Sequence, residues 1–225
     1  FAKSFKGGPA DIEKTAVTCI NDKNSLGINR AESFLRLSAL YLRQKKYQEA
    51  LDACKSIFDE PSASLMQKAS ALTQRVMIVC SDPSSTTEKV ASELAAFEAF
   101  GVAAPKQKYD TYGAVSSFFI SGKDNDKALG YAEKQLANAA VYDKGKVLNS
   151  IAAIYDAMNK KDKAVETRKQ AVAHLRSQLF PTVPVGVFGP MMANDLFDAL
   201  NGIPDATTTE KKEAADIAIS HKVCP

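Results

Sequence analysis

The chain has 225 residues, of which 45% are hydrophobic, enough for one or two globular domains or one repeat array. Its net charge of +3 comes from 29 basic and 26 acidic residues that are interspersed along nearly every segment. This mixture argues against a basic surface for nucleic acid, so we expect no nucleic-acid partner. No apolar run approaches the roughly 18–20 residues that cross a bilayer, so we expect no transmembrane segment.

Alanine is plentiful, and small side chains let helices approach closely, which favours packed helices over an all-β fold. Tryptophan is absent and aromatic residues make up only 8% of the chain. Near the start, Pro9 and Asp11 stand where a helix would begin, and a short apolar face ends at about residue 20. We expect residues 21–29 to form a loop.

The first clear helix pair spans residues 31–43 and 46–58. In its first helix an apolar residue recurs every three or four positions from Phe34 to Tyr41, which is the period of one helix face. Pro61 ends the second helix. The pattern therefore predicts two antiparallel helices joined by a short polar turn.

The second helix pair is less regular. An apolar stripe over residues 65–80 predicts its first helix, and Ser85 with Glu88 predicts a capping box at the start of its second. This helix should end near Gly101, and Pro105 should lie in the link that follows.

Two further pairs share one spacing with the first pair. In each, an aromatic residue precedes an alanine by nine positions across a polar turn. Three copies of one helix–turn–helix unit predict a repeat array, an architecture that usually binds other molecules rather than catalysing reactions. The three aromatic–alanine pairs are Tyr41 and Ala50, Phe119 and Ala128, and Tyr155 and Ala164.

The C-terminal part differs in composition. Residues 180–190 are apolar but rich in proline and glycine, so we predict an irregular strap rather than a helix. Short helices should follow at 191–201 and 208–220, the second with a capping box of Thr207 and Glu210. We expect the strap to cover the end of the array, and an exposed docking patch is the alternative.

No set of residues in the sequence has the spacing of a catalytic or metal site. His174 and His221 are the only histidines, and we expect His174 to have a surface or capping role at a helix end. We therefore predict no catalytic residue, no cofactor, no metal and no enzyme activity. Cys54 should be a small buried residue, whereas Cys224 could form a disulfide if the protein is exported. The four cysteines are Cys19, Cys54, Cys80 and Cys224.

Three segments resemble tetratricopeptide repeats (TPRs), whose pattern of about 34 residues fixes the places of large, small and aromatic side chains. In the segment at 31–64 these positions hold Phe34, Leu37, Ser38, Tyr41, Ala50, Cys54, Ile57 and, one place early, Pro61. In the segment from Tyr109 they hold Tyr112, Val115, Ser116, Phe119, Ala128, Ala132 and Gln135. In the segment at 145–178 they hold Leu148, Ile151, Ala152, Tyr155, Ala164, Arg168 and Ala171.

The resemblance implies an all-α fold, a right-handed superhelix of antiparallel helix pairs with about four repeats plus flanking helices. The small residue of the first helix and the alanine of the second should lie where the two helices approach most closely. Arg168 and Gln135 depart from the pattern and indicate a looser or more exposed face. The implied divisions are an N-terminal segment at 1–30 with a short capping helix, the array at 31–178, and a capping strap with helices at 179–225.

TPR arrays present the first helix of each pair to a concave groove, which implies a set of partner-binding residues here. One TPR subgroup clamps a peptide carboxylate with paired Lys and Asn residues, but this chain has Leu35 and Ala39 at those positions, so the clamp is absent. The groove residues implied by position are Glu32, Arg36, Arg43, Asp110, Ser117, Lys146, Asn149 and Asp156.

The leading hypothesis for function is a non-catalytic scaffold that binds a protein or peptide in this groove. The alternative is an exported bacterial envelope protein that binds a small ligand such as a glycan or peptide fragment. Its support is a chain that begins at Phe1 rather than Met, and the absence of tryptophan argues against a sugar site. An enzyme in a helical fold would need converging titratable residues, which no spacing indicates. We expect a soluble protein, cytoplasmic or exported.

Overall fold

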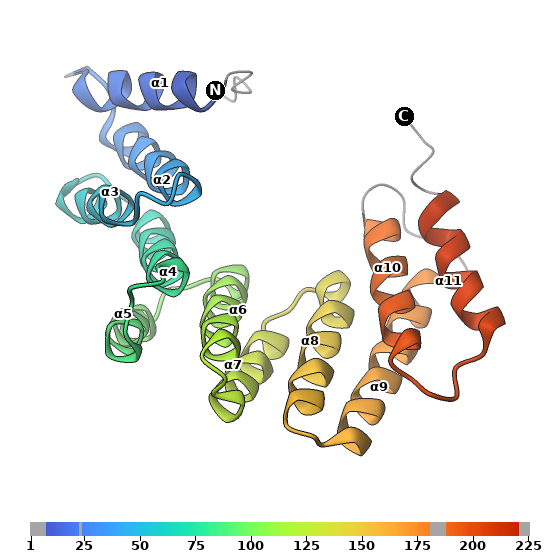
Figure 1. The fold of residues 1–225 in the computed structure, drawn as a ribbon. Coiled ribbons are helices and arrows are strands. Elements are labelled where there is room, and N and C mark those ends of the chain that lie inside the picture. The colour runs from blue at the N-terminus through green and yellow to red at the C-terminus, as the bar shows by residue number, and fades with distance from the viewer. Residues whose placement is uncertain (1–7, 23, 181–187, 221–225) are drawn as a thin grey trace. The chain divides into compact units, whose positions relative to one another are not determined.

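The computed structural model describes residues 8–22, 24–180 and 188–220, and all of its regular structure is helical (Figure 1). This confirms the all-α prediction. The helices within these residues are α1 (Pro9–Asn21), α2 (Gly27–Arg43), α3 (Tyr47–Asp59), α4 (Leu65–Ser81), α5 (Thr87–Phe100), α6 (Pro105–Ser121), α7 (Asn125–Ala137), the 3-10 turn η1 (Val141–Asp143), α8 (Lys144–Ala157), α9 (Lys161–Leu179), α10 (Phe188–Asn201) and α11 (Thr208–Ser220).

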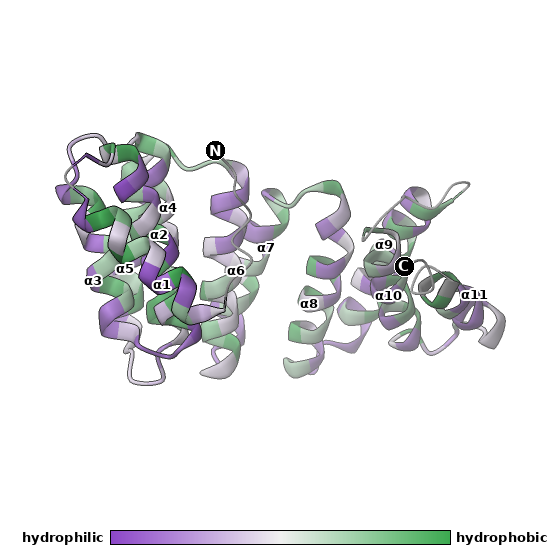
Figure 2. Cartoon of the chain, turned by 90° about the horizontal axis from the view of Figure 1, so that it is seen from above, coloured by the Kyte–Doolittle hydropathy of each residue, from purple (hydrophilic) through white to green (hydrophobic). Residues whose placement is uncertain are grey.

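The chain forms two compact units, residues 1–118 and residues 119–225. Within the first unit α2 packs against α3, and α4 packs against both. Within the second unit α8 packs against α9, and α10 packs against both. In Figure 2 hydrophobic and hydrophilic residues alternate around each helix, as expected for helices that bury one face. The divisions predicted at residues 30 and 178 stay predictions.

The pairs α2–α3 and α6–α7 consist of helices of the same two lengths. We call the first helix of each pair the A helix and the second the B helix. The A helices α2, α4 and α6 each contain 17 residues, and the B helices α3 and α7 each contain 13. A recurring helix length is typical of a repeated unit, whereas α8 and α9 of the fourth predicted repeat contain 14 and 19 residues.

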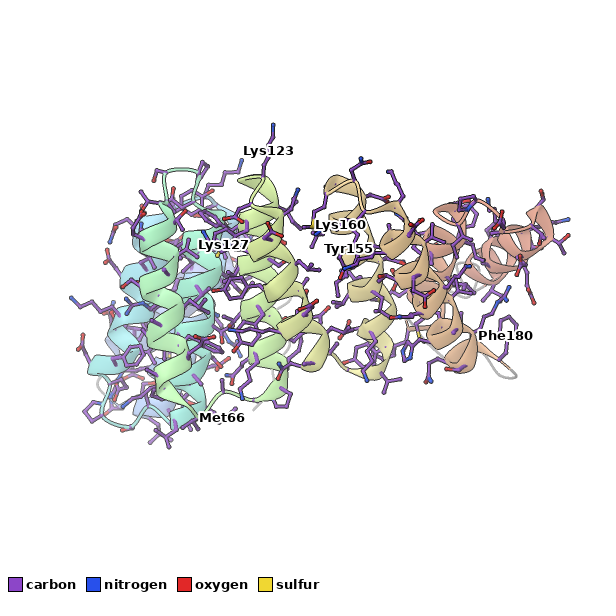
Figure 3. All side chains as sticks on the ribbon, turned by 90° about the horizontal axis from the view of Figure 1, so that it is seen from below. Met66, Lys123, Lys127, Tyr155, Lys160 and Phe180 are labelled. Carbon is purple, nitrogen blue, oxygen red and sulfur yellow. The ribbon has the colours of Figure 1, made fainter. Side chains whose placement is uncertain are left out.

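The turns of the three predicted repeats have the same backbone conformation. Each has a non-glycine residue with left-handed φ: 59° at Lys45, 60° at Lys123 and 58° at Asn159. The next residue donates its N–H to the carbonyl of the repeat's aromatic residue, as in a Schellman C-cap. These bonds are 2.9 Å from Lys46 to Tyr41, 2.9 Å from Asp124 to Phe119 and 2.8 Å from Lys160 to Tyr155. Lys123 and Lys160 lie at helix ends in Figure 3.

Glycine at the left-handed turn positions is expected to stabilise the fold. A left-handed φ costs a residue with a Cβ roughly 1–2 kcal/mol, and glycine avoids this cost. The greater flexibility of glycine in the unfolded chain offsets part of that advantage. We expect Lys45→Gly and Lys123→Gly each to raise the free energy of unfolding by roughly 0.5–1 kcal/mol. Asn159→Gly should gain less, because asparagine tolerates this conformation. Urea unfolding followed by circular dichroism measures all three, and a loss of stability in either lysine variant would contradict the turn conformation.

Small buried side chains occupy the predicted contact positions within each pair. Ser38, Ala50, Ala152 and Ala164 all have 0% exposure. Cys54 is also buried, as predicted, and its Sγ lies 2.9 Å from Ser38 Oγ. Burial raises the pKa of the Cys54 thiol to about 11, so the thiol remains protonated at neutral pH.

Several predicted helix starts are wrong. α2 begins at Gly27, inside the loop predicted at 21–29. The second helix of the second pair is capped by Thr86, whose side chain accepts the Lys89 N–H at 3.3 Å, and not by Ser85 with Glu88. Pro105 opens α6 instead of lying in the preceding link. Proline is favoured at a first helical position because its missing N–H has no partner to lose there.

The C-terminal segment contains a further helix pair. α10 begins at Phe188, so 188–190 are helical and not part of a strap, while 181–187 lie outside the described residues. α10 packs on α9 and α8 in the way that α4 packs on α3 and α2, and α11 packs on α10. The predicted capping box is confirmed: Thr207 Oγ1 accepts the Glu210 N–H at 3.2 Å, and Glu210 Oε2 accepts the Thr207 N–H at 2.9 Å.

Arg168 does not create the exposed face predicted from its departure from the repeat pattern. Its side chain is only 16% exposed and forms an ion pair of 2.5 Å with Asp156. A Cβ at Gly202, which follows α10, would lie 2.0 Å from Arg168 Nε. Arg168 is therefore covered by the end of α10, where a larger residue than glycine would collide with it.

Candidate protein-binding surface

The predicted groove residues of the first repeat lie along α2. Glu32 and Arg36 are exposed and form an ion pair of 3.2 Å between Oε1 and Nε. Both line a shallow cavity of about 310 Å³ between α1 and α2, together with Thr15 and Cys19 of α1. Arg43 is exposed at the last position of α2. These residues are accessible to a partner, and two of them share one cavity.

The predicted residues of the third repeat lie on α6. Asp110 is partly buried and forms an ion pair with Lys106, one turn earlier on the helix. The Lys106 ammonium also lies 4.9 Å from the centre of the Tyr109 ring. Ser117 is exposed two turns further on. Asp110 is thus already paired within its helix.

The three predicted residues of the fourth repeat have different environments. Asp156 accepts hydrogen bonds from Arg168 and from Lys161, at 2.5 Å and 3.1 Å, and the first of these lowers its pKa. Asn149 Nδ2 donates to the backbone carbonyl of Asp195 on α10 at 2.7 Å. Lys146 is exposed on α8. Asp156 therefore holds the α8–α9 pair together, whereas Asn149 faces α10.

Sequence reasoning missed the residues that α10 contributes. Phe188, Met191, Asp195 and Asp198 recur at intervals of three and four, which puts them on one helix face. The Phe188 ring lies 4.4 Å from the ring of Tyr142 on η1, measured between centroids. We define the α8–α10 surface as Tyr142, Asn149, Phe188, Met191, Asp195 and Asp198.

The α8–α10 surface is apolar at one end and acidic at the other. Tyr142, Phe188 and Met191 are 37%, 40% and 43% exposed. Asp195 is half-buried, and its burial raises the pKa of its carboxyl to about 6. The ammonium of Lys146 lowers this pKa, and the carboxylates of Asp198 and Asp143 raise it further. The Asp195 carboxyl is therefore within electrostatic range of two further carboxylates and one ammonium.

Other titratable groups of the described ranges, such as those of His174 and Cys80, lie outside the α8–α10 surface. No cluster of three or more His, Cys, Asp or Glu side chains there could hold a metal ion. His174 Nε2 contacts the Val141 carbonyl at 2.8 Å and so packs η1 against α9. Burial raises the pKa of the Cys80 thiol to about 12. Across 8–22, 24–180 and 188–220, every helix is too short or too polar to span a membrane.

Comparison with known proteins identifies the fold. No protein-family model and no curated protein sequence matches the chain. Its structure is similar to the crystal structure of nearly identical TPR-like repeats from a Podosopora anserina protein assigned as a kinesin light chain. The TM-score is 0.56 at 14% identity, over 86% of this chain and 95% of that chain. A single-residue variant of that protein gives 0.54 at 14% identity, over 86% and 93%. The chain therefore has a TPR-like repeat fold.

Proposed function

We propose that this chain is a non-catalytic module that binds a protein or peptide segment on the exposed faces of its A helices. The observation that supports this is the repeated helix pair: in pairs such as α2 with α3 and α8 with α9, small and apolar residues are buried between the helices while the A helix keeps exposed residues. Folds of this kind present a row of similar helix faces, which suits an extended partner. The exposed residues Glu32, Arg36 and Arg43 of α2 are then part of the binding surface.

Affinity capture from a lysate of the protein's own source tests this function. The immobilised full chain is compared with Arg36→Glu/Arg43→Glu, and the captured proteins are quantified by mass spectrometry. We expect at least one partner to fall by about tenfold with this variant, because a reversed charge repels what the native charge attracts.

The matched control is Lys14→Glu/Lys55→Glu. It makes the same change in net charge within the same unit, but on exposed positions of α1 and α3, outside the A helices. The control should retain the partner within about twofold. Equal loss in both variants, or no retained partner, would argue against binding through the A helices. Circular dichroism spectra of all variants show whether folding is intact.

A further inference from the structure

We infer that the α8–α10 surface binds a protein segment in which an arginine or lysine stands beside a bulky apolar residue. This inference rests on the proposed function and names the partner chemistry for one part of the A-helix face. It follows from two features of the surface: an exposed aromatic and methionine cluster, and an acidic cluster next to it.

The apolar end of the surface has the composition of an interface core. Tyr142, Phe188 and Met191 each expose more than a third of their area, and the two rings are in direct contact. Val141, next to Tyr142, is 51% exposed. Aromatic residues and methionine are enriched in protein interfaces, whereas isolated apolar residues on a surface carry no such meaning. These four exposed apolar residues lie on the adjoining elements η1 and α10, and together they suit contact with an apolar side chain of a partner.

The acidic end lies next to the apolar end on the same helix face. Asp195 is one turn beyond Met191, and Asp198 is almost one turn beyond Asp195. Asp143 on η1 and Lys146 on α8 are the other charged groups that act on the Asp195 carboxyl. Three carboxylates against one ammonium leave an excess of negative charge at a half-buried position, where a partner cation is attracted and a partner anion repelled.

The carboxylates of this end give the reason to expect a hydrogen-bond donor in the partner. A guanidinium or ammonium group brings N–H donors and no acceptors, so it suits Asp195 and Asp198, whose carboxylates only accept hydrogen bonds. Arginine or lysine is therefore the polar residue we expect in the partner.

The direct test is a titration of the full chain, labelled with ¹³C at its methionine methyl groups, followed by NMR. The probe is a peptide with the core Arg-Leu-Arg-Phe between Gly-Ser flanks. Met191 reports on the surface, and Met66, which is exposed on α4 in the other unit (Figure 3), is the internal control. We expect a saturable shift of the Met191 methyl signal and none of the Met66 signal.

Two comparison peptides separate the contributions of charge and apolar contact. One replaces both arginines with glutamate, and the other replaces leucine and phenylalanine with serine. We expect each to bind at least about tenfold more weakly than the first peptide. A Met191 shift of equal size with the glutamate peptide would overturn the inference.

Substitutions on the surface should change affinity in opposite directions. Asp195→Asn/Asp198→Asn keeps the side-chain shapes and removes two charges, so we expect about tenfold weaker binding. Lys146→Met removes the opposing cation, so binding should strengthen by about threefold. The matched control Asp205→Asn/Asp216→Asn, on exposed positions elsewhere in the same unit, should leave affinity within about twofold. Affinity that does not respond to Asp195→Asn/Asp198→Asn would overturn the inference.

A pH series gives an independent readout of the same contact. Asp195 must be ionised to attract the cation, and its pKa is about 6 in the presence of Asp143, Lys146 and Asp198. Binding should therefore weaken as the pH falls from 7.5 to 5, and this dependence should shrink in Asp195→Asn/Asp198→Asn. A flat profile in the native chain would contradict the role of this carboxylate.

The outcomes also distinguish this inference from the general function. If no peptide moves Met191 while Arg36→Glu/Arg43→Glu still loses a lysate partner, the A-helix function stands and the inference fails. If neither experiment detects binding, both fail. If light scattering shows self-association that Phe188→Ser abolishes, the surface is a contact between copies and the inference is overturned.

Discussion

Gly145→Ala is expected to lower the free energy of unfolding by about 1–3 kcal/mol, although alanine is the better helix former. Gly145 lies buried in the first turn of α8. A Cβ there would lie 2.4 Å from Leu175 Cδ2 and 2.6 Å from its Cγ. Leu175 has 0% exposure in the core between α9 and α10, so it cannot move aside without disturbing its other neighbours.

Gly130→Ala is the matched control, measured in the same urea unfolding experiment. Gly130 is exposed in α7, and no atom lies within 4 Å of the added Cβ, so this variant should gain about 0.5–1 kcal/mol. A second check adds Leu175→Ala, which alone should cost about 2–5 kcal/mol. The double variant should lose less than the two single losses added together, because the smaller side chain makes room for the new methyl group. Stabilisation by Gly145→Ala would contradict the close approach of α8 and α9.

Ala164→Leu is expected to destabilise the second unit by about 1–3 kcal/mol or more. Ala164 is the repeat alanine of α9 and has 0% exposure, as does Ala152, the small residue of α8. A leucine there adds three carbon atoms where two helices are tightly packed. The side chain must therefore adopt a strained rotamer or push the helices apart.

The control for Ala164→Leu is the same substitution at Ala153, on the exposed face of α8. Ala153→Leu should change the free energy of unfolding by less than about 0.5 kcal/mol. Circular dichroism at rising urea concentration measures both variants, since the chain has no tryptophan for fluorescence. Similar losses in the two variants would mean that Ala164 is not the contact residue of its pair.

The repeat could be predicted from the sequence because its determinants are local. The aromatic residue, the polar turn and the alanine lie within ten positions, and the turn closes with a hydrogen bond such as that from Lys160 to Tyr155. Local rules also caused the errors. Pro190 and Gly189 indicated irregular structure, but both fall in the first turn of α10, where proline loses no hydrogen bond.

Only part of the candidate surface could be predicted from the sequence. Position in the repeat pointed to Lys146 and Asn149, which do lie beside α10. Asp195 and Phe188 were missed because their significance depends on α10 packing against α8, a contact between segments more than 30 residues apart. The one available signal was the spacing of Phe188, Met191 and Asp195 on a single helix face. Arg168 was misjudged for the same reason, since Gly202 covers it only in the folded unit.

The packing of each helix against its near neighbours has a consequence for how the chain folds. Helices such as α2, α3 and α4 meet partners that follow closely in the sequence, so most contacts join parts of the chain that are near each other in sequence. Such low contact order favours fast folding. A nucleus can form at any helix pair and grow by adding the next one, so the order of assembly need not follow a single path.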